Sequence, residues 1–488
     1  MAINYNFIKG VDLPTWQWMP FLPNGSPSYH GYDTDYDGVR YIYAVIQSGT
    51  TATSASATQL HRFDTWGLGW QYLATVTSGN RGLTMTYDAT RNIVLIAHGA
   101  ALTSWQVFNL NKTAVSVCGV SCAAFALTTM TPVLPAAADY GACFVAIKPK
   151  DIPSMVESGA ISTGTTTTTM IDSDPLRAYT DQMIGQQFKI TSGALAGQRR
   201  FITSVTDENT LVVGSAFGST PVVGVTYEIA LPSGTATAGA ASTLTDSTAT
   251  WTVNQYANSD VVITSGTGAG QKRRIASNTA TVLTLATAVT GNTNTGNWSV
   301  TPDATSVYVI QPSSDFLYYT PGTTGTGFYK IDLATGASAT TWTTLTASPA
   351  AFGGGGNVMW ADNVGAFNLL GMRGAGTATF YQYNIGLNSW LTLTMRCGVE
   401  TFNTGSCSTI WDGQRKMIIQ KDSTVRLYAL NLATRELEPL ATAPYATPGA
   451  YCGKRARVVT TADGVQWLYL QRAGGGEFYR IPLEWRQF

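Results

Sequence analysis

DYDGVRYIYAVI, residues 35–46, is the stretch that decides the fold. An Asp-Gly step stands directly ahead of a run of aromatic and β-branched residues. Asp-Gly supplies the positive φ values that a tight hairpin needs, and the run has the composition of a half-buried strand. The stretch therefore predicts a turn that leads into a β-strand.

The same signal recurs along the chain. Turn aspartates followed by apolar runs stand at Asp37, Asp88, Asp139, Asp362, Asp412 and Asp463, at intervals of 51, 51, 223, 50 and 51 residues. Each unit continues into a third strand that ends in a polar turn, as in FYQYNIGLNSW (380–390). A fixed period of this size indicates a repeat architecture, and four short strands joined by hairpins make one blade of a β-propeller.

Six units predict an all-β, six-bladed propeller. The last unit ends soon after its third strand, and the N-terminal segment TWQWMPFL (15–22) is expected to supply the fourth. Pairing strands from both ends of the chain would close the ring and leave no open edge at the junction. The long interval predicts an insertion in blade three, which divides the chain into propeller residues 1–148, an insertion at 149–321 and propeller residues 322–488.

The inserted region has an internal repeat. KITSGALAGQRRFI (189–202) matches VITSGTGAGQKRRI (262–275), and TMIDSD near residue 170 matches STLTDST (242–248). Alternating Thr, Val and Ile with glycine turns is typical of strands. We expect two tandem barrel-like or sandwich-like β modules, at about 158–232 and 233–312.

Each module carries a basic hairpin. The candidate partner-contact residues are Arg199, Arg200, Lys272, Arg273 and Arg274. One interpretation is a solvated strand edge where positive charge discourages wrong pairing. The other is a contact for an acidic neighbouring protein.

Charge limits the possible partners. The chain has 29 basic and 29 acidic residues, and charged residues make up only 12% of it. It lacks the positive field of a non-specific nucleic-acid or acidic-membrane binder, so neither partner is expected. So few charges fit a surface that is buried in an assembly, and we expect a homo-oligomeric ring. No secretory signal and no apolar run of about 18 residues is seen, so synthesis in the cytoplasm is expected.

The six cysteines leave two interpretations open. Cys118 and Cys122 are close in sequence, as are Cys397 and Cys407, and these four are candidates for disulfides in an oxidising environment. The alternative is that they are buried thiols that pack as small apolar side chains.

Catalytic signals are weak. His30, His61 and His98 are the chain's histidines, and none lies near a nucleophile-elbow motif, so we expect no enzyme and no cofactor. Asp33-Thr34-Asp35-Tyr36-Asp37-Gly38 matches the start of a calcium loop, but Ala44 stands where a calcium loop has Glu. A calcium site and a plain polar loop both remain open. A glycan hydrolase built from paired carboxylates also remains open.

Two resemblances follow from these motifs. The repeat units resemble kelch-type blades, although isolated glycines such as Gly99 and Gly371 replace the kelch double glycine. The threonine-rich modules, with TSGTGAGQ (264–271) and TPDATSVYVI (301–310), resemble modules of tailed-bacteriophage virion proteins.

The second resemblance implies a structural component of a phage virion. We expect a neck, collar or tail ring or sleeve protein that binds neighbouring virion proteins and could dock fibres. A short-tail nozzle or hub protein is one alternative, and a receptor-binding or carbohydrate-binding adhesin is another. The expected location is the virion, after synthesis in the host cytoplasm.

Overall fold

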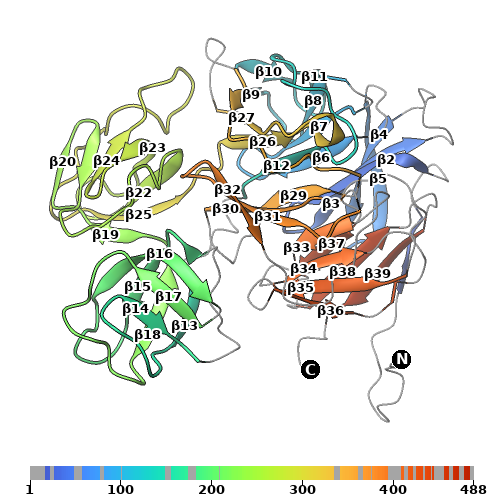
Figure 1. Ribbon diagram of the computed structural model, residues 1–488. Helices are drawn as coiled ribbons and strands as arrows, with labels where there is room; N and C mark the ends of the chain where they lie inside the picture. The colour runs from blue at the N-terminus through green and yellow to red at the C-terminus, as the bar shows by residue number, and fades with distance from the viewer. Residues whose placement is uncertain are drawn as a thin grey trace, which may run out of the picture.

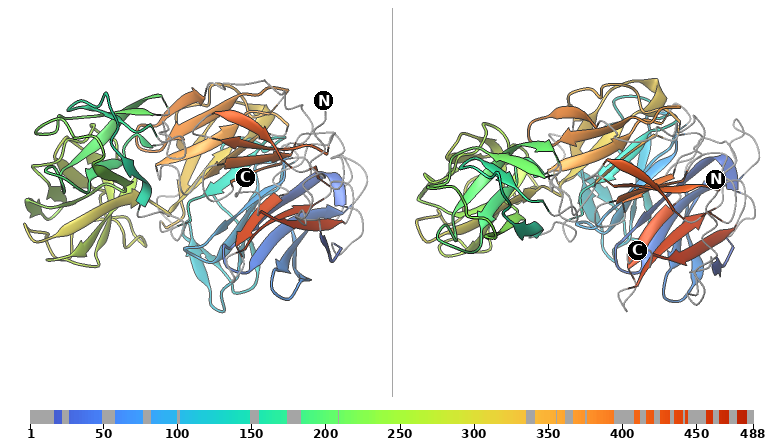
Figure 2. Two further views of the ribbon diagram at one scale, coloured as in Figure 1. Left: turned by 90° about the horizontal axis from the view of Figure 1, so that it is seen from below. Right: turned by 60° about the horizontal axis from the view of Figure 1, so that its bottom comes forward.

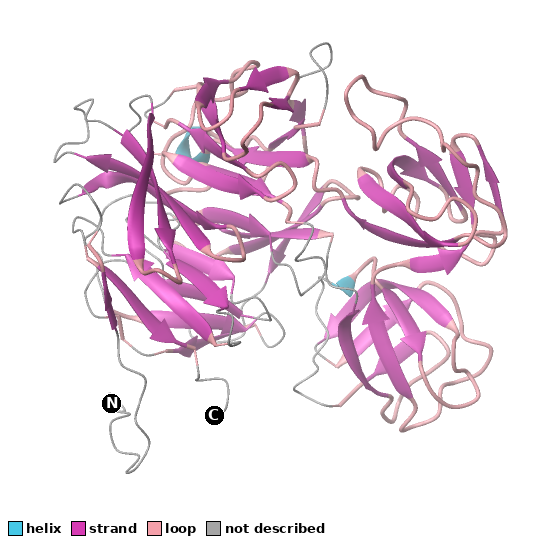
Figure 3. Ribbon diagram, turned by 180° about the vertical axis from the view of Figure 1, so that it is seen from behind, coloured by secondary structure: helices cyan, strands magenta, loops and turns pink. Residues whose placement is uncertain are grey.

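The computed structural model describes most of the chain. The described residues are 17–21, 27–48, 58–76, 82–99, 102–148, 155–173, 183–207, 209–334, 341–354, 356–360, 367–374, 376–393, 408–411, 416–420, 425–431, 435–440, 442–443, 456–460, 465–471 and 477–483. Within them the protein is all-β, with antiparallel sheets, no α-helix and short 3-10 turns such as η5 (Gly322–Thr324) (Figure 3). None of the helical turns there is long and apolar enough to cross a membrane.

Six four-stranded sheets form in the described part of the chain. The first contains β2 (Pro27–Tyr36), β3 (Tyr41–Ser48), β4 (Thr58–Asp64) and β5 (Gly69–Val76). The second contains β6 (Thr84–Asp88), β7 (Ile93–Ala97), β8 (Trp105–Asn109) and β11 (Leu127–Thr129), with a small ribbon of β9 (Val115–Val117) and β10 (Val120–Cys122) between β8 and β11 in sequence. The third contains β12 (Cys143–Ala146), β26 (Phe316–Thr320), β27 (Tyr329–Asp332) and β28 (Thr343–Thr344).

The remaining three sheets follow in chain order. The fourth contains β29 (Asn357–Trp360), β30 (Asn368–Met372), β31 (Phe380–Asn384) and β32 (Ser389–Leu393). The fifth contains β33 (Ser408–Trp411), β34 (Lys416–Gln420), β35 (Leu427–Asn431) and β36 (Glu436–Pro439). The sixth contains β37 (Ala456–Thr460), β38 (Gln466–Gln471), β39 (Phe478–Pro482) and β1 (Gln17–Met19).

The first strands of these sheets follow one another round a closed circuit. β2 contacts β6, β6 contacts β12, β12 contacts β29, β29 contacts β33, β33 contacts β37, and β37 contacts β2. The second strands are the apolar ones, as in β7, where all five residues are buried. Sheets arranged around such a circuit make a β-propeller.

The circuit joins the two ends of the chain at the sixth sheet. β1 pairs antiparallel with β39, and Trp18 lies opposite Tyr479. Met19 is buried with Phe63 and Phe478, so the N-terminal strand also contributes to the core between the sixth and first sheets.

Two further sheets lie between β12 and β26 in sequence, although these two strands pair with each other. One has the order β13 (Met155–Ala160), β18 (Thr226–Ala230), β15 (Gln187–Ile190), β16 (Arg199–Asp207), β17 (Thr210–Val213) and β14 (Thr169–Ile171). The other has the order β19 (Ser233–Thr235), β25 (Val307–Pro312), β22 (Ser259–Ser265), β23 (Lys272–Asn278), β24 (Val282–Leu285), β21 (Thr243–Thr245) and β20 (Ala238–Ala240).

We call residues 155–230 the first module and residues 233–312 the second module. Their strands follow the same order, with β20 as an addition to the second. Each module has an apolar core, and that of the second also includes Phe201 and Phe367. Both stand to one side of the propeller, and all views agree on this (Figures 1 and 2).

Two details of the repeat were predicted wrongly. Asp37 and Asp88 do form the turns between the first and second strands, where Asp37 Oδ1 accepts the Val39 and Arg40 N–H groups and Asp88 Oδ1 accepts that of Thr90. Asp139 instead precedes β12, the first strand of its sheet, so its 51-residue spacing is a coincidence.

The predicted boundary at residue 321 is also wrong. β26 pairs with β12 inside the third four-stranded sheet, so residues 316–320 belong to the propeller. The turn aspartate of that sheet is Asp315, which directly precedes β26.

Candidate functional site

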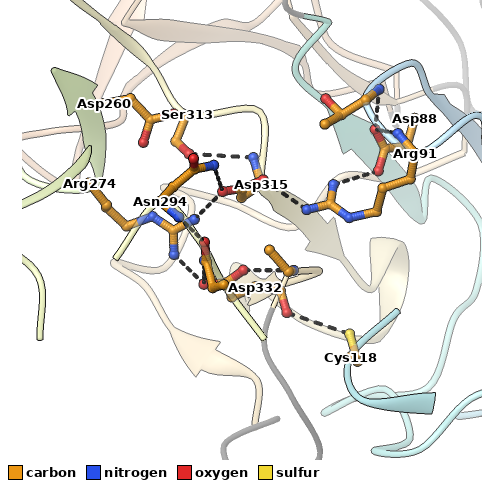
Figure 4. Close-up of polar contacts among 12 residues, drawn as sticks. Asp88, Arg91, Cys118, Asp260, Arg274, Asn294, Ser313, Asp315 and Asp332 are labelled. Atoms are coloured by element: carbon orange, nitrogen blue, oxygen red, sulfur yellow. Dashed lines mark hydrogen bonds and ion pairs between the residues drawn. The ribbon is translucent and has the colours of Figure 1, made fainter. Parts of the chain in front are cut away.

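A buried cluster of charges joins the second module to the propeller. Arg274 lies in β23 of the second module, and its side chain is only 6% exposed. Its guanidinium donates to Asp315 Oδ2 at 2.6 Å and to Asp332 Oδ2, and it stacks over the ring of Phe316 at 4.4 Å. Figure 4 shows Arg274 between the two aspartates, which stand at the start of β26 and the end of β27.

The cluster continues into the second sheet of the propeller. Arg91 follows β6 and donates to Asp88 Oδ2 and to Asp315 Oδ1, each at 2.8 Å (Figure 4). Asn294 of the second module donates to Asp315 Oδ2 at 3.1 Å. Asp315 thus connects two propeller sheets and the module, and these cations hold its pKa below the usual value despite its burial.

Two more charged groups lie at the edge of this cluster. Asp260 in β22 is completely buried, and its ion-pair partner is Lys272 Nζ at 3.3 Å. Burial raises the pKa of Asp260 to about 6. Lys330 in β27 lies 4.2 Å above the Phe316 ring that Arg274 also covers, and burial lowers its pKa to about 7.

An apolar contact lies beside the charges. Tyr256 of the second module and Phe367, at the start of the β30 hairpin, have ring centroids 5.5 Å apart. Gly386, in the turn between β31 and β32, fits directly against Gln255, because a Cβ there would overlap the Gln255 carbonyl oxygen. The second module is therefore seated on the third and fourth sheets together.

The first module is attached to the second by the equivalent surface, but with different chemistry. Phe201 occupies the repeat position of Arg274 and packs against Trp251 and Tyr256, with centroids 6.2 and 6.4 Å away. Gln187 and Arg199 both donate to the carbonyl oxygen of Ser233. Each module thus docks through its β15–β16 or β22–β23 hairpin onto the segment that follows it.

The structure corrects the predicted role of one of the five basic residues. Arg274 is buried and paired inside the chain, because the propeller supplies two aspartates that the sequence pattern did not connect to it. Lys272 pairs with Asp260, while Arg199 donates to Ser233 as above. Arg200 donates to Ala216 O, and Arg273 to Asn297 O and Ser299 Oγ. The other four residues are half-buried, and their role as partner contacts stays a prediction.

The candidate disulfide between Cys118 and Cys122 is also wrong. Both are free, buried thiols, and Cys118 Sγ lies 3.6 Å from the Asp332 carbonyl oxygen. Burial raises the pKa of Cys118 to about 12 and also raises that of Cys122, which keeps both protonated. Cys397 and Cys407 lie outside the described residues.

The aspartates of the candidate calcium motif join two sheets of the propeller. Asp33 and Asp35 lie in β2, not in a loop. Asp33 Oδ2 accepts Thr84 Oγ1–H and Met85 N–H, and Asp35 Oδ2 accepts Thr86 Oγ1–H and Tyr87 N–H, all at 2.8 to 2.9 Å. Lys148 Nζ also lies 3.1 Å from Asp35 Oδ1. The polar-loop alternative is therefore wrong for these two residues, whose carboxylates fasten β2 to β6.

Two of the histidines are buried in the propeller. His61 in β4 is buried, which lowers its pKa to about 4, and burial likewise lowers the pKa of His98. His98 bonds Ser104 and Gln106, and His30 lies in β2. Across the described ranges, His, Cys, Asp and Glu side chains form no group of three or more that could hold a metal.

The residues that sequence reasoning missed are Asp315, Asp332 and Arg91. A signal for the first was present, because Pro312-Ser313-Ser314-Asp315 follows the second module as Pro232-Ser233-Gly234-Thr235 follows the first. The segment that receives each module is thus itself part of the repeat.

Comparisons with known proteins complete the description. No protein-family model and no curated protein matches the chain. Among solved structures, YjhT matches with 19% identity and a TM-score of 0.24, over 32% of this chain and 54% of that chain, so this chain spans about half of its length. A mutant of AofleA from Arthrobotrys oligospora, with three arginines changed to alanine, matches with 8% identity and a TM-score of 0.41, over 96% of this chain and 86% of that chain. The WD40 domain of coronin from Toxoplasma gondii matches with 10% identity and a TM-score of 0.33, over 97% and 88% of the two chains.

Proposed function

We propose that the six four-stranded sheets are the blades of one kelch-like propeller, and that the two modules are an insertion between the first and second strands of its third blade. The closed circuit of first strands supports the number of blades. The pairing of β12 with β26 supports the position of the insertion, since the chain leaves the third sheet after one strand and returns to it as the next.

We further propose that this chain is a structural component of a tailed-phage virion, a neck, collar or tail ring or sleeve protein that binds neighbouring virion proteins. The observation that carries the proposal is the way the modules are held. Buried contacts join first module to second module and second module to propeller, so the phage-like modules extend the propeller as a fixed arm. A fixed arm suits assembly, because little conformational freedom is lost on binding.

The partner contacts that we propose for such an arm include exposed apolar residues, because Arg274 is buried within the chain. Val222 and Val223 of the first module are 69% and 58% exposed, and Val300 of the second is 51% exposed. All three lie in the segment that precedes the final strand of their module.

Solution assembly tests the proposal. We expect the purified chain to form ordered oligomers, or to bind other particle proteins, through interfaces of about 1,000 Å² or more. Changing Val222 and Val223 to Asp should reduce this association, whereas Val39→Asp, at a propeller residue that is 58% exposed, is the matched control. Light scattering and negative-stain imaging give the readout. A chain that stays monomeric at all concentrations, binds no particle protein and cleaves glycans would contradict the structural role.

A carbohydrate-binding adhesin is the second candidate, favoured by an exposed aromatic pair. Trp18 and Phe21 are 62% and 61% exposed, and their ring centroids lie 6.0 Å apart at the edge of the sixth sheet. Exposed aromatic pairs are typical of binding surfaces. Glycan-array binding that is lost in Trp18→Ala would favour this function over a scaffold.

A further inference from the structure

The junction between the second module and the propeller is built from charges that share one another's partners. Asp260 lies opposite Arg274 in the β22–β23 pairing, so it acts on the same guanidinium as Asp315 and Asp332 of the propeller. When Asp260 is ionised, it attracts Arg274 toward the module. When it is neutral, Arg274 interacts mainly with the two propeller aspartates.

Lys330 has the opposite relation to Arg274. Both cations lie over the ring of Phe316, at 4.2 and 4.4 Å from its centroid. A protonated Lys330 therefore repels the arginine that the module brings in, and Asp332 compensates only part of this. A neutral Lys330 removes the repulsion. Undocking would return both Asp260 and Lys330 toward water, so each senses whether the module is seated.

We propose that this junction is a pH-sensitive latch, in which Asp260 on the module and Lys330 on the propeller set how firmly the second module is held. The groups that face Asp260 are Lys272, Arg274, Asp315 and the Ser313 hydroxyl, and those that face Lys330 are Arg274 and Asp332. Arg91 and Asp88 complete the cluster from the neighbouring sheet.

The direction of the Asp260 effect follows from its pKa. Burial raises that pKa to about 6, from an ordinary value near 4. The docked state therefore binds a proton that the undocked state releases between about pH 4 and pH 6. Docking through Asp260 is strongest in acid, and this contribution is lost as the pH rises through about 6.

Lys330 acts at the other end of the range. Burial and Arg274 lower its pKa to about 7, from an ordinary value near 10.4. The docked state therefore gives up a proton that the undocked state keeps, and docking strengthens as the pH rises above about 7. Together the two groups predict the weakest hold between about pH 6 and pH 7.

The first module provides an internal control. Its junction with the second module uses Phe201, Trp251 and Tyr256, which do not change charge near neutral pH, together with Gln187 and Arg199. The latch therefore predicts pH dependence at one junction and not at the other.

Hydrogen exchange on the full chain from pH 5 to pH 9, corrected for the intrinsic exchange rate, tests the latch. Peptides around 271–276 and 307–316 report on the module–propeller junction, and a peptide around 199–207 reports on the first module. For the two junction peptides, we expect the equilibrium constant for opening to be largest between about pH 6 and pH 7. It should fall by up to about tenfold per pH unit on either side. The control peptide should show no such maximum.

Two variants separate the acidic side of the pH profile from its alkaline side. Asp260→Asn should abolish the fall of the opening constant below about pH 6, and it should lower that constant at pH 7. Lys330→Met should abolish the fall above about pH 7 and leave the fall in acid unchanged. An opening constant of the wild-type chain that does not vary with pH, or variants whose opening constant still falls on both sides, would overturn the latch. If a variant does not fold, the wild-type profile measured against the control peptide still decides the question.

Discussion

At one repeat position, the first module carries Phe201 and the second carries Arg274. The phenylalanine faces another module and is surrounded by aromatic rings. The arginine faces the propeller and meets Asp315 and Asp332. A buried ion pair of this kind adds little stability compared with an apolar contact, but removing one partner leaves the other charge buried and uncompensated. The single residue therefore decides which neighbour each module can accept.

This difference predicts unequal effects at adjacent arginines. Arg274→Ala should destabilise the chain by about 3–5 kcal/mol, because it leaves the buried Asp315 and the partly buried Asp332 with less compensation. Arg273→Ala is the matched control and should cost about 1 kcal/mol or less, because its partners are exposed. Urea denaturation of the two variants gives the comparison. Equal costs would show that the cluster does not hold the module.

The carboxylates of β2 give a second prediction for single residues. Asp33→Ala would leave the buried Met85 N–H and Thr84 hydroxyl without their acceptor, at a cost of about 1–3 kcal/mol for each group. Because these oxygens are already bonded, adding Ca²⁺ or a chelator should leave the melting temperature of the wild-type chain unchanged. A calcium-dependent rise in that temperature, lost in Asp33→Ala, would restore the calcium interpretation.

Among the elements, β1 is only three residues long, yet it pairs with the last strand of the sixth sheet and packs against the first sheet. Met19 is 7% exposed and packs with Phe63 and Phe478, whereas its neighbour Trp18 is 62% exposed. Met19→Asp should therefore destabilise the chain by more than about 3 kcal/mol, because it buries an unpaired charge, while Trp18→Asp should cost much less. Thermal unfolding of both variants measures this. Similar melting temperatures would argue against closure by β1.

The strands themselves could be predicted from the sequence, because strand and turn preferences are local. The Asp-Gly turn before β3 and the apolar run of β7 carry their own signals, and β1 could be assigned because the last unit lacks a strand. The role of Asp139 could not, because a spacing of 51 residues places a turn without saying which strand follows it. That choice depends on β12 pairing with β26, which are about 170 residues apart.

At the scale of the whole molecule, the contact between the second module and the propeller could not be predicted from the sequence. From the sequence alone, Arg274 cannot be distinguished from the four other basic hairpin residues. Only the structure shows that Asp315 and Asp332 lie beside it. The interpretation as a solvated strand edge failed for Arg274, because charge and position in a hairpin do not show what the hairpin is packed against. The module repeat could be predicted, but its docking depends on complementary surfaces from distant segments.

Gly386 offers the sharpest test of that docking. Its backbone does not require a positive φ, so alanine is acceptable to the turn itself, but the added methyl would overlap the Gln255 carbonyl oxygen of the second module. Gly386→Ala should therefore lower the stability of the full chain by about 1–3 kcal/mol. Gly218→Ala is the control, because a Cβ there would meet only the Gln198 side chain at 3.9 Å.

A chain that lacks the two modules tests whether the loss of stability in Gly386→Ala arises at the junction with the second module. Ala146 and Leu317 are paired, so a short Gly/Ser linker in place of residues 150–313 can join β12 to β26 as an ordinary hairpin. We expect this shortened chain to fold cooperatively, with Asp315 still paired to Arg91. In it, Gly386→Ala should be neutral or slightly stabilising, because alanine restricts the unfolded chain more than glycine does and no longer meets Gln255. An undiminished penalty in the shortened chain would mean that Gly386 is required by its own turn, and loss of cooperative unfolding on shortening would mean that the modules form part of the propeller core.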